Sequence, residues 1–261
     1  MRIDRQERLV KLLETNVMLR IHELCELLGA SPATVRRDLS ELEEKGVIKR
    51  INGGAMLNAR SDFSPPPSHE EQDPFLLYKQ AIARLAVSLV KEGDTIFIDA
   101  GTTNIEIAEL LSGYSNISII TNSIEIAYLF KKYAMGRKIS VYVCGGTIGE
   151  VTPEASIVGP LAEQMITQFR ASIAFIGTSG IDLQHGVTDP HFLLASIKKR
   201  MIEFSSRVVL VADHSKFGKV NMAHVCNLSS LHHVITDSLT PASFVESMTT
   251  LGLKVWRAEL E

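Results

Sequence analysis

The feature that most constrains this chain is a capped helix start at residues 31–39, Ser-Pro-Ala-Thr-Val-Arg-Arg-Asp-Leu. The Ser31 side chain can accept a hydrogen bond from the first backbone N–H groups of a helix. Pro32 suits the first helical position because its missing N–H would have had no partner there. A helix is therefore predicted to begin at this point.

The apolar residues of this helix predict which side chains face outward. Val35, Leu39 and Leu42 recur at the spacing of one buried helical stripe. The side chains left outside this stripe, near the helix N-terminus, are Ala33, Thr34, Arg36 and Arg37. This end of a recognition helix meets base edges and phosphates in DNA-binding proteins, although two adjacent arginines can also form a merely solvated face.

The flanking residues supply the other parts of a helix-turn-helix. Residues 3–15 hold leucines in a helical rhythm, and a second short apolar stripe within 21–28 stops at Gly29, which begins a turn. Residues 47–55 alternate apolar and basic side chains before paired glycines, which predicts a β-hairpin wing. The cap, the turn and the basic wing together favour DNA binding over a solvated face. The predicted DNA-contacting residues are Ser31, Pro32, Ala33, Thr34, Arg36, Arg37, Lys49 and Arg50.

Residues 3–57 resemble the winged helix-turn-helix of the DeoR family of bacterial transcription regulators. The resemblance rests on Thr34-Val35-Arg36-Arg37-Asp38-Leu39 and on Arg50-Ile51-Asn52-Gly53-Gly54-Ala55. Asn52 is a departure, since the family commonly places a bulkier or basic residue there. Asp38 is part of the family signature. Its carboxylate, one turn into the helix, can orient the neighbouring arginines, or it can be a simple charge on the helix surface.

The charge distribution agrees with a DNA-binding N-terminal part. The chain has 261 residues and a formal net charge of −3, which would argue against nucleic acid if it were evenly spread. Residues 1–60, however, hold 11 basic and 9 acidic side chains, whereas the remainder holds 16 and 21. The positive excess therefore lies where DNA binding is predicted.

Cysteine spacing and hydropathy exclude several other classes of protein. Cys25, Cys144 and Cys226 lie far apart without metal-ligand spacing, so we expect neither a disulfide framework nor a metal site. No signal peptide pattern opens the chain, and no apolar run is long enough to span a bilayer. A cytoplasmic location is expected.

A change in composition separates two domains. Residues 58–74 contain four prolines and three serines, which prevents a regular helix and is typical of an extended linker. We predict a winged helix-turn-helix DNA-binding domain at 1–57, a linker at 58–74 and an effector-sensing and oligomerisation α/β domain at 75–261. With 45% apolar residues the chain can fill two cores.

The second domain alternates predicted strands and helices. Its β-branched runs predict strands at 95–98, 117–120, 139–143, 173–176, 208–211 and 234–236. Helical patterns cover 81–90, 104–111, 124–133, 161–169 and 192–204. This alternation predicts a Rossmann-like, mainly parallel, doubly wound sheet. No glycine-rich dinucleotide or P-loop motif follows the first strand, so no cofactor is expected.

Small and polar residues follow several predicted strands, at 99–103, 121–123 and 144–147. Ligands of open α/β sheets bind at the carboxyl ends of strands, and hydroxyls and free N–H groups at helix starts attract anions. Helix capping would explain one such loop, but three loops at one edge favour a site for a phosphorylated, hydroxyl-rich molecule. The predicted effector-binding residues are Asp99, Gly101, Thr102, Thr103, Thr121, Asn122, Ser123, Gly145, Gly146, Thr147, Lys198, Asp213 and Lys216.

These strand-end residues, with Ala212-Asp213-His214-Ser215-Lys216-Phe217-Gly218, resemble the DeoR-family effector domain. That domain shares its fold with ribose-5-phosphate isomerase and binds sugar phosphates, which the resemblance implies for this chain. Leu194 is a departure, because the family often has a glutamate there. Asp189 and His191 lie nearby in the sequence and are possible substitutes.

The resemblance implies a DNA-binding repressor of a carbohydrate uptake or catabolism operon, released from its operator by a phosphorylated sugar. Its expected partners are double-stranded operator DNA, the sugar effector and further copies of the chain in a dimer or tetramer. The alternative is a sugar-phosphate isomerase with an attached DNA-binding domain, since a His beside Asp and Lys can act as a general acid or base. The missing glutamate removes the best candidate for the base, so binding without turnover is favoured and no catalytic residue is assigned.

Overall fold

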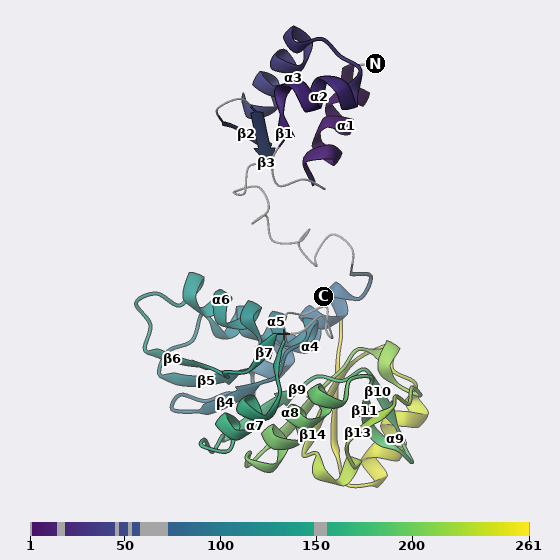
Figure 1. Ribbon diagram of the computed structural model, residues 1–261. Coiled ribbons are helices and arrows are strands. Elements are labelled where there is room, and N and C mark those ends of the chain that lie inside the picture. The colour runs from purple at the N-terminus through teal and green to yellow at the C-terminus, as the bar shows by residue number, and fades with distance from the viewer. Residues whose placement is uncertain are drawn as a thin grey trace. The chain divides into compact units, whose positions relative to one another are not determined.

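The computed structural model describes residues 2–14, 19–44, 47–51, 54–57, 73–148 and 156–260. The chain divides into two compact units, Met1–Gln72 and Asp73–Glu261, and each is described by itself (Figure 1). Most of the predicted linker, residues 58–72, lies outside the described residues. Asp73 and Pro74, at its end, belong to the C-terminal unit.

The N-terminal unit contains a helix-turn-helix and a small antiparallel sheet of order β1-β3-β2. Its elements are α1 (Arg2–Glu14), β1 (Leu19–Arg20), α2 (Ile21–Leu28), α3 (Pro32–Glu44), β2 (Ile48–Ile51) and β3 (Gly54–Leu57). The helix predicted to begin at Pro32 does so, and β2 and β3 confirm the hairpin. The hairpin turn, residues 52 and 53, lies outside the described residues. Strand β1, with only two residues, is too short for a periodic pattern and was not predicted.

Local chemistry sets the turn and the third helix. Gly29 ends α2 with a φ of 58°, a left-handed conformation that glycine adopts at little steric cost. Ser31 Oγ accepts a hydrogen bond from the Thr34 N–H at 3.3 Å, which caps α3 as expected. Val35 and Leu39 are fully buried and Leu42 is nearly so, which confirms the predicted stripe.

Asp38 joins two helices instead of acting on the neighbouring arginines. It is only 1% exposed, and its carboxylate accepts two hydrogen bonds from Arg5 of α1, from Nε at 2.6 Å and from Nη2 at 3.2 Å. The expected roles as an orienting group for Arg36 and Arg37, or as a surface charge, were therefore both wrong. Asp38 projects toward α1 because it lies beside the buried stripe.

We predict that Asp38→Ala lowers the free energy of unfolding of the N-terminal unit by about 3 kcal/mol, because it leaves a partly buried guanidinium without its carboxylate. Native-state hydrogen exchange of the α3 amides measures this loss. The single tryptophan, Trp256, lies in the other unit, and its fluorescence transition should not move. Equal α3 protection in the variant and the parent would show that the ion pair does not stabilise this unit.

The C-terminal unit is built on a seven-stranded sheet of order β15-β14-β12-β9-β4-β5-β6. All of its neighbouring strands pair in parallel. The strands are β4 (Thr95–Ile98), β5 (Ile117–Thr121), β6 (Ile139–Val143), β9 (Ile173–Ile176), β12 (Val208–Val211), β14 (His233–Asp237) and β15 (Lys254–Ala258). Six of them were predicted. Only β15 was missed, because its alternation includes the charged Lys254 and Arg257.

Helices cover both faces of this sheet (Figure 1). One face packs against α4 (Leu76–Val87), α5 (Thr102–Leu111) and α6 (Ile124–Tyr133), and the other against α7 (Pro160–Ile166), α8 (Phe192–Glu203) and α9 (Ala242–Thr250). Adjacent residues of β4 show the division, since Ile96 and Ile98 belong to the first core and Phe97 to the second. This arrangement confirms the predicted doubly wound α/β class.

Two smaller sheets complete the C-terminal unit. An antiparallel sheet joins β10 (Gly180–Asp182), β11 (Gly186–Asp189) and β13 (Ala223–Cys226), and β7 (Thr147–Ile148) pairs with β8 (Ile157–Val158). None of these strands was predicted, because each has two residues or three, or lacks a run of β-branched residues, as in Gly-Val-Thr-Asp and Ala-His-Val-Cys. Within the described residues, no helix is both long and apolar enough to cross a membrane.

Candidate functional site

A cavity of about 230 Å³ lies at the carboxyl ends of β4, β9 and β12. The order in which successive strands are added reverses at this place. Strands β5 and β6 are added on one side of β4, and β9, β12, β14 and β15 on the other. Open α/β sheets bind ligands at such a switch point, where the loops diverge. The lining residues are Ala100, Gly101, Thr102, Thr103, Asn104, Gly177, Thr178, Ser179, Asp189, Pro190, His191, Leu194, Lys198, Val211, Ala212 and Lys216.

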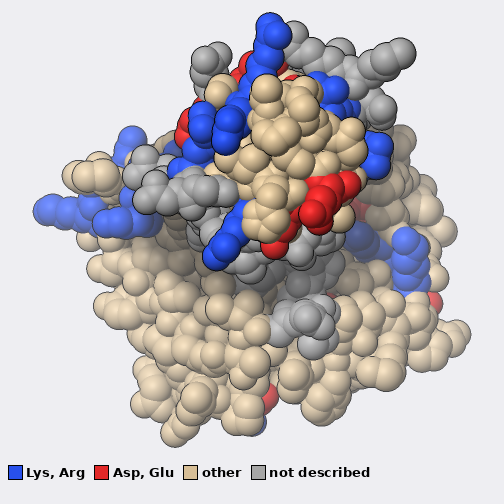
Figure 2. Space-filling view, turned by 45° about the horizontal axis from the view of Figure 1, so that its top comes forward, with Lys and Arg blue, Asp and Glu red and all other residues tan. Residues whose placement is uncertain are grey.

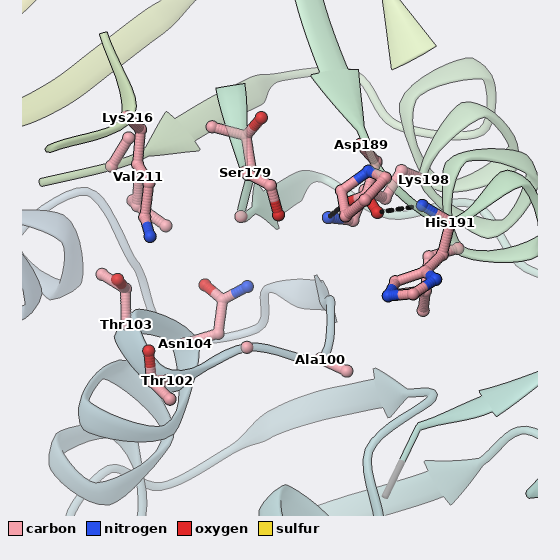
Figure 3. A pocket seen from close by; sticks show the side chains of 16 residues that line it. Ala100, Thr102, Thr103, Asn104, Ser179, Asp189, His191, Lys198, Val211 and Lys216 are labelled. Carbon is pink, nitrogen blue, oxygen red and sulfur yellow. Dashed lines mark hydrogen bonds and ion pairs between the residues drawn. The ribbon is translucent and has the colours of Figure 1, made fainter. Parts of the chain in front are cut away.

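One side of the cavity is built on three buried charged residues. Lys198 of α8 lies between two carboxylates, with Nζ 2.7 Å from Asp189 Oδ2 and 3.4 Å from Asp99 Oδ2. The three residues are at most 4% exposed. Asp99 also accepts a hydrogen bond from the Gly177 N–H at 3.3 Å. Figure 3 shows Lys198 and Asp189 together at the cavity wall, with His191 beside them.

This cluster shifts the pKa values of its members. Burial raises the pKa of Asp99 to about 6, even though the Lys198 ammonium opposes the shift. Burial alone would lower the pKa of Lys198, but the charges of Asp99 and Asp189 outweigh it and raise that pKa. Lys198 therefore stays charged at neutral pH, and Asp99 changes its charge within about a unit of neutrality.

The opposite side of the cavity suits an anion. Thr102, Thr103 and Asn104 form the first turn of α5, whose free N–H groups carry a partial positive charge. In Figure 3 the ammonium of Lys216 extends from across the cavity toward this turn. Gly101, before the helix, has a φ of 151°, where a larger residue would be strained. The helix start, the hydroxyls and Lys216 can together hold a phosphate.

Two acceptor atoms near the cavity have no hydrogen-bond partner among the described residues. They are Oδ1 of Asn104, which lines the cavity, and Oδ1 of Asp99, which is enclosed behind Lys198 where a ligand does not reach it. A buried acceptor without a donor is costly, so a ligand hydroxyl that donates to Asn104 Oδ1 gains free energy here. The cavity thus combines a cationic end with an acceptor for a hydroxyl group.

The structure brings together part of the predicted effector-binding set. Gly101, Thr102, Thr103, Lys198 and Lys216 all line the cavity. Asp99 is fully buried and is not a lining residue, but it contacts three residues that are, Lys198, Gly177 and Asn104. Asp189 and His191, considered as possible substitutes at the position of the family glutamate, line the cavity too, and so does Leu194 itself.

The loop after β5 does not line the cavity. Thr121, Asn122 and Ser123 are fully buried and bond to the protein itself. Asn122 Oδ1 accepts from the Ala100 N–H at 3.0 Å, and Ser123 Oγ accepts from the Ile126 N–H at 3.2 Å as the cap of α6. Helix capping and internal hydrogen bonds therefore account for this loop, and the structure does not bring it to the cavity.

The loop after β6 and Asp213 are also outside the cavity lining. Gly145, Gly146 and Thr147 are exposed beside the edge strand of the sheet, on the far side of β5 from the switch point. Asp213 is fully buried, and its Oδ1 accepts from the Ser215 N–H at 2.9 Å to cap a short helical turn. Strand-end position alone could not separate these residues from the true lining.

Sequence reasoning missed other lining residues. Thr178 and Ser179 follow β9, and the strand-end rule applied to that strand would have found them. Lys79 of α4 had no signal, because it lies in an amphipathic pattern. It is 6% exposed and does not itself line the cavity, but its Nζ donates to Oγ1 of the lining residue Thr102 at 2.8 Å. The described residues contain no group of His, Cys, Asp and Glu side chains that could hold a metal ion.

The predicted DNA-contacting residues lie on the N-terminal unit around the start of α3. Ser31, Pro32 and Ala33 are exposed there, and Thr34 is half-buried. Arg36 and Arg37 are also exposed, and Arg37 Nε lies 3.7 Å from Glu41 Oε1. On the face of this unit seen in Figure 2, Lys and Arg side chains stand among acidic ones.

The wing supplies a further cation close to α3. Arg50 is exposed, and its Nη1 donates to Ser40 Oγ of α3 at 3.2 Å. Lys49 belongs to β2, but its side chain lies outside the described residues. Arg50 and the start of α3 therefore offer positive charge on one small unit.

Two family models match the chain. Residues 5–61 match the DeoR-like helix-turn-helix domain, and residues 76–238 match the DeoR C terminal sensor domain. The chain belongs to the DeoR family. The DeoR C terminal sensor domain contains the cavity described above, and the DeoR-like helix-turn-helix contains α3 and the wing.

Curated DeoR-family relatives match nearly the whole chain. The chain is 37% identical to the transcriptional repressor AccR of Agrobacterium fabrum, over 91% of this chain and 90% of that protein. It is 35% identical to the lactose phosphotransferase system repressor of Staphylococcus epidermidis, over 90% of this chain and 92% of that protein. Among solved structures it is similar to ribose 5-phosphate isomerase A from Methanocaldococcus jannaschii, with 18% identity and a TM-score of 0.39. The similarity covers 57% of this chain and 55% of that one.

We predict that Lys198→Met lowers the free energy of unfolding of the C-terminal unit by about 3–5 kcal/mol, because two buried carboxylates lose their counter-charge. The loss should grow between pH 5 and pH 7.5. Without the ammonium, the pKa of Asp99 rises further above about 6, so the folded state retains a proton that the unfolded state releases. Stability then falls as the pH rises through this range.

Urea unfolding followed by Trp256 fluorescence at both pH values measures this effect. Lys199→Met is the matched control, because Lys199 is the exposed neighbour on α8 and its loss should change stability little. A deficit that is the same at both pH values would contradict the ionic role of Lys198.

Proposed function

We propose that the protein is a transcriptional repressor of a carbohydrate uptake or catabolism operon, and that a phosphorylated sugar releases it from its operator. The observation that supports this most is the cavity of the sensor domain, which combines the cationic α5 start and Lys216 with an unpartnered acceptor on Asn104. A sugar phosphate has the complementary groups. Relatives named as sugar-system repressors, such as the lactose phosphotransferase system repressor, point the same way.

Operator binding is assigned to the N-terminal unit. The start of α3 presents Arg36 and Arg37 with its free N–H groups, and the wing adds Arg50. A helix-turn-helix places this end of its second helix in the major groove, while flanking cations contact phosphates. Because such proteins bind two half-sites, we propose that the chain acts as a dimer or tetramer, in the cytoplasm where the operator lies.

Release from the operator follows from a shift between two states. If the free protein favours an arrangement of DNA-binding units that fits both half-sites, a ligand that prefers another arrangement weakens operator binding. The ligand can change the equilibrium only as far as its affinity differs between the two states. The sensor domain therefore determines when the protein binds, and α3 determines where.

The alternative function is isomerisation of a sugar phosphate, which the acid-base groups around Lys198 and His191 suggest. Asp99 is enclosed behind Lys198 with no exposed surface, so it has no direct access to a substrate carbon. Asp189 is held by Lys198 and by the His191 N–H at 3.0 Å. We therefore propose binding without turnover.

For DNA binding, we predict that Arg36→Ala and Arg37→Ala each weaken affinity about tenfold without unfolding the protein. The measurement is a gel-shift titration at fixed salt, on a DNA fragment selected from a random library by the full-length chain. Lys132→Ala is the control, since it removes an exposed positive charge from α6 of the other unit. Affinities equal to the parent for both arginine variants would place the DNA contact elsewhere.

For ligand binding, we predict that Lys216→Met abolishes the rise in melting temperature that sugar phosphates cause. The variant loses the cation that faces the first turn of α5. Lys219→Met, three residues further and exposed, should respond as the parent does. The probes are ribose 5-phosphate, glucose 6-phosphate and fructose 6-phosphate, in scanning fluorimetry of the full chain.

The same samples distinguish a sensor from an enzyme. The parent should shift in melting temperature and release DNA while each sugar phosphate is recovered unchanged by NMR. Conversion of an aldose phosphate to its ketose would instead support the isomerase. An unaltered response in Lys216→Met would show that the ligand binds outside this cavity.

A further inference from the structure

The segment that begins the C-terminal unit, residues 73–78, contacts Lys79 and His214, two residues that adjoin the lining of the cavity. We call it the lead-in segment; it directly follows residues 58–72 in the sequence. Asp73 Oδ1 accepts a hydrogen bond from the Phe75 N–H at 2.9 Å, and Asp73 O accepts from the Leu76 N–H at 3.1 Å. These bonds shape the turn from which α4 begins. The conformation of the lead-in segment therefore depends on Asp73.

Lys79 joins Asp73 to the cavity. Its ammonium forms an ion pair with Asp73 Oδ2 and also donates to Thr102 Oγ1 at 2.8 Å. Thr102 lies in the first turn of α5, where the cavity suits an anion. The nearly buried Lys79 ammonium thus contacts both the lead-in segment, through Asp73, and the start of α5, through Thr102, where a phosphate would bind.

Asp73 also interacts with the second cation of this place. Burial raises the pKa of Asp73, but the hydrogen bond from Lys79 and the charges of Lys79 and Lys216 lower it overall. Asp73 therefore experiences the field of the same two lysines that a phosphate would use. Its carboxylate is the anion that pairs with these lysines in the described structure.

Aromatic contacts also join the lead-in segment to the helical turn that carries Lys216. Phe75 and Tyr78 pack edge-on against the His214 ring, with centroids 5.3 and 5.1 Å apart. His214 is held by Asp237, whose Oδ1 lies 3.0 Å from its Nδ1. His214 and Lys216 lie two residues apart in one short helical turn, so the lead-in segment packs against the same turn that supplies Lys216.

We propose that Lys79 is a ligand-binding residue, that a phosphate in the cavity takes its ammonium from Asp73, and that the loss of this ion pair loosens the lead-in segment. The inference rests on the proposed function and names the regulation of the same site. Asn104 provides a separate indication of a ligand here, because its buried Oδ1 is unpartnered and it lines the cavity in the same first turn of α5 as Thr102.

The competition follows from charge. A phosphate dianion bound beside Thr102 and Lys216 attracts the Lys79 ammonium more strongly than one carboxylate does, and it repels Asp73. Binding is then coupled to the state of the lead-in segment, and the coupling is reciprocal. Removing the negative charge of Asp73 should therefore strengthen ligand binding, although Asp73 does not contact the ligand.

The affinity test compares variants with opposite expected signs. By calorimetry with inorganic phosphate and ribose 5-phosphate on the full chain, Asp73→Asn should bind several-fold more tightly, because asparagine keeps an oxygen for the Phe75 N–H but not the charge. Lys79→Met should bind at least tenfold more weakly. Asp182→Asn is the control, since Asp182 also caps a turn, through the Gln184 N–H at 2.9 Å, but does not line the cavity.

If the Asp73–Lys79 pair only stabilises the fold, Asp73→Asn and Lys79→Met should both weaken binding, and this result would overturn the proposal. Failure of both probes to bind the parent would overturn the proposed function, and the coupling with it. Binding that protects residues 102–104 while the two variants retain the parent affinity would overturn the coupling alone.

Hydrogen exchange then tests the release itself. With ribose 5-phosphate, the amides of residues 102–104 should exchange more slowly in the parent, while those of Phe75 and Leu76 exchange faster. In Asp73→Asn the Phe75 and Leu76 amides should already exchange fast without the ligand and change little when it binds. Slower exchange of Phe75 and Leu76 on binding would mean that the ligand tightens the lead-in segment, which is the reverse of the proposal.

Discussion

The cavity depends on one buried ammonium, that of Lys198, held between Asp99 and Asp189. These residues come from the end of β4, from β11 and from α8, so the ion pairs join three separate elements at one place. Burying three charged groups costs free energy that their attraction only partly returns. These ion pairs also fix the position of α8 relative to the sheet, and α8 forms part of the wall that the ligand would contact.

The sheet determines where this cluster can form. Strand order reverses between β4 and β9, so the chain segments leaving them diverge and leave space that no side chain fills. The loops after β5 and β6 have similar compositions but lie to one side of this point. They cap helices or remain exposed, which is why polarity after a strand was a necessary but not a sufficient signal.

Short-range chemistry made several features predictable. Ser31 and Pro32 define the start of α3, and Gly29 defines the end of α2, because the bonds and dihedrals involved connect residues at most a few positions apart. The buried strands were found for a similar reason, since β-branched runs of four or five residues need no partner to be recognised. By contrast, β15 and the strands of the smaller sheets have patterns too short or too polar to stand out.

The sequence by itself determined the DNA-binding unit, the α/β class and the residues that follow the central strands, because each of these depends on residues only a few positions apart. Only the tertiary structure decided which of those residues share a cavity. It also showed that Asp38 binds Arg5, that Lys79 reaches Thr102 and Asp73, and that Lys198 is enclosed by two carboxylates. Most of these pairs lie far apart in the chain, and Asp73 meets Lys79 only through the turn that begins α4. Their contacts depend on how helices pack on the sheet and on each other, which no local pattern encodes.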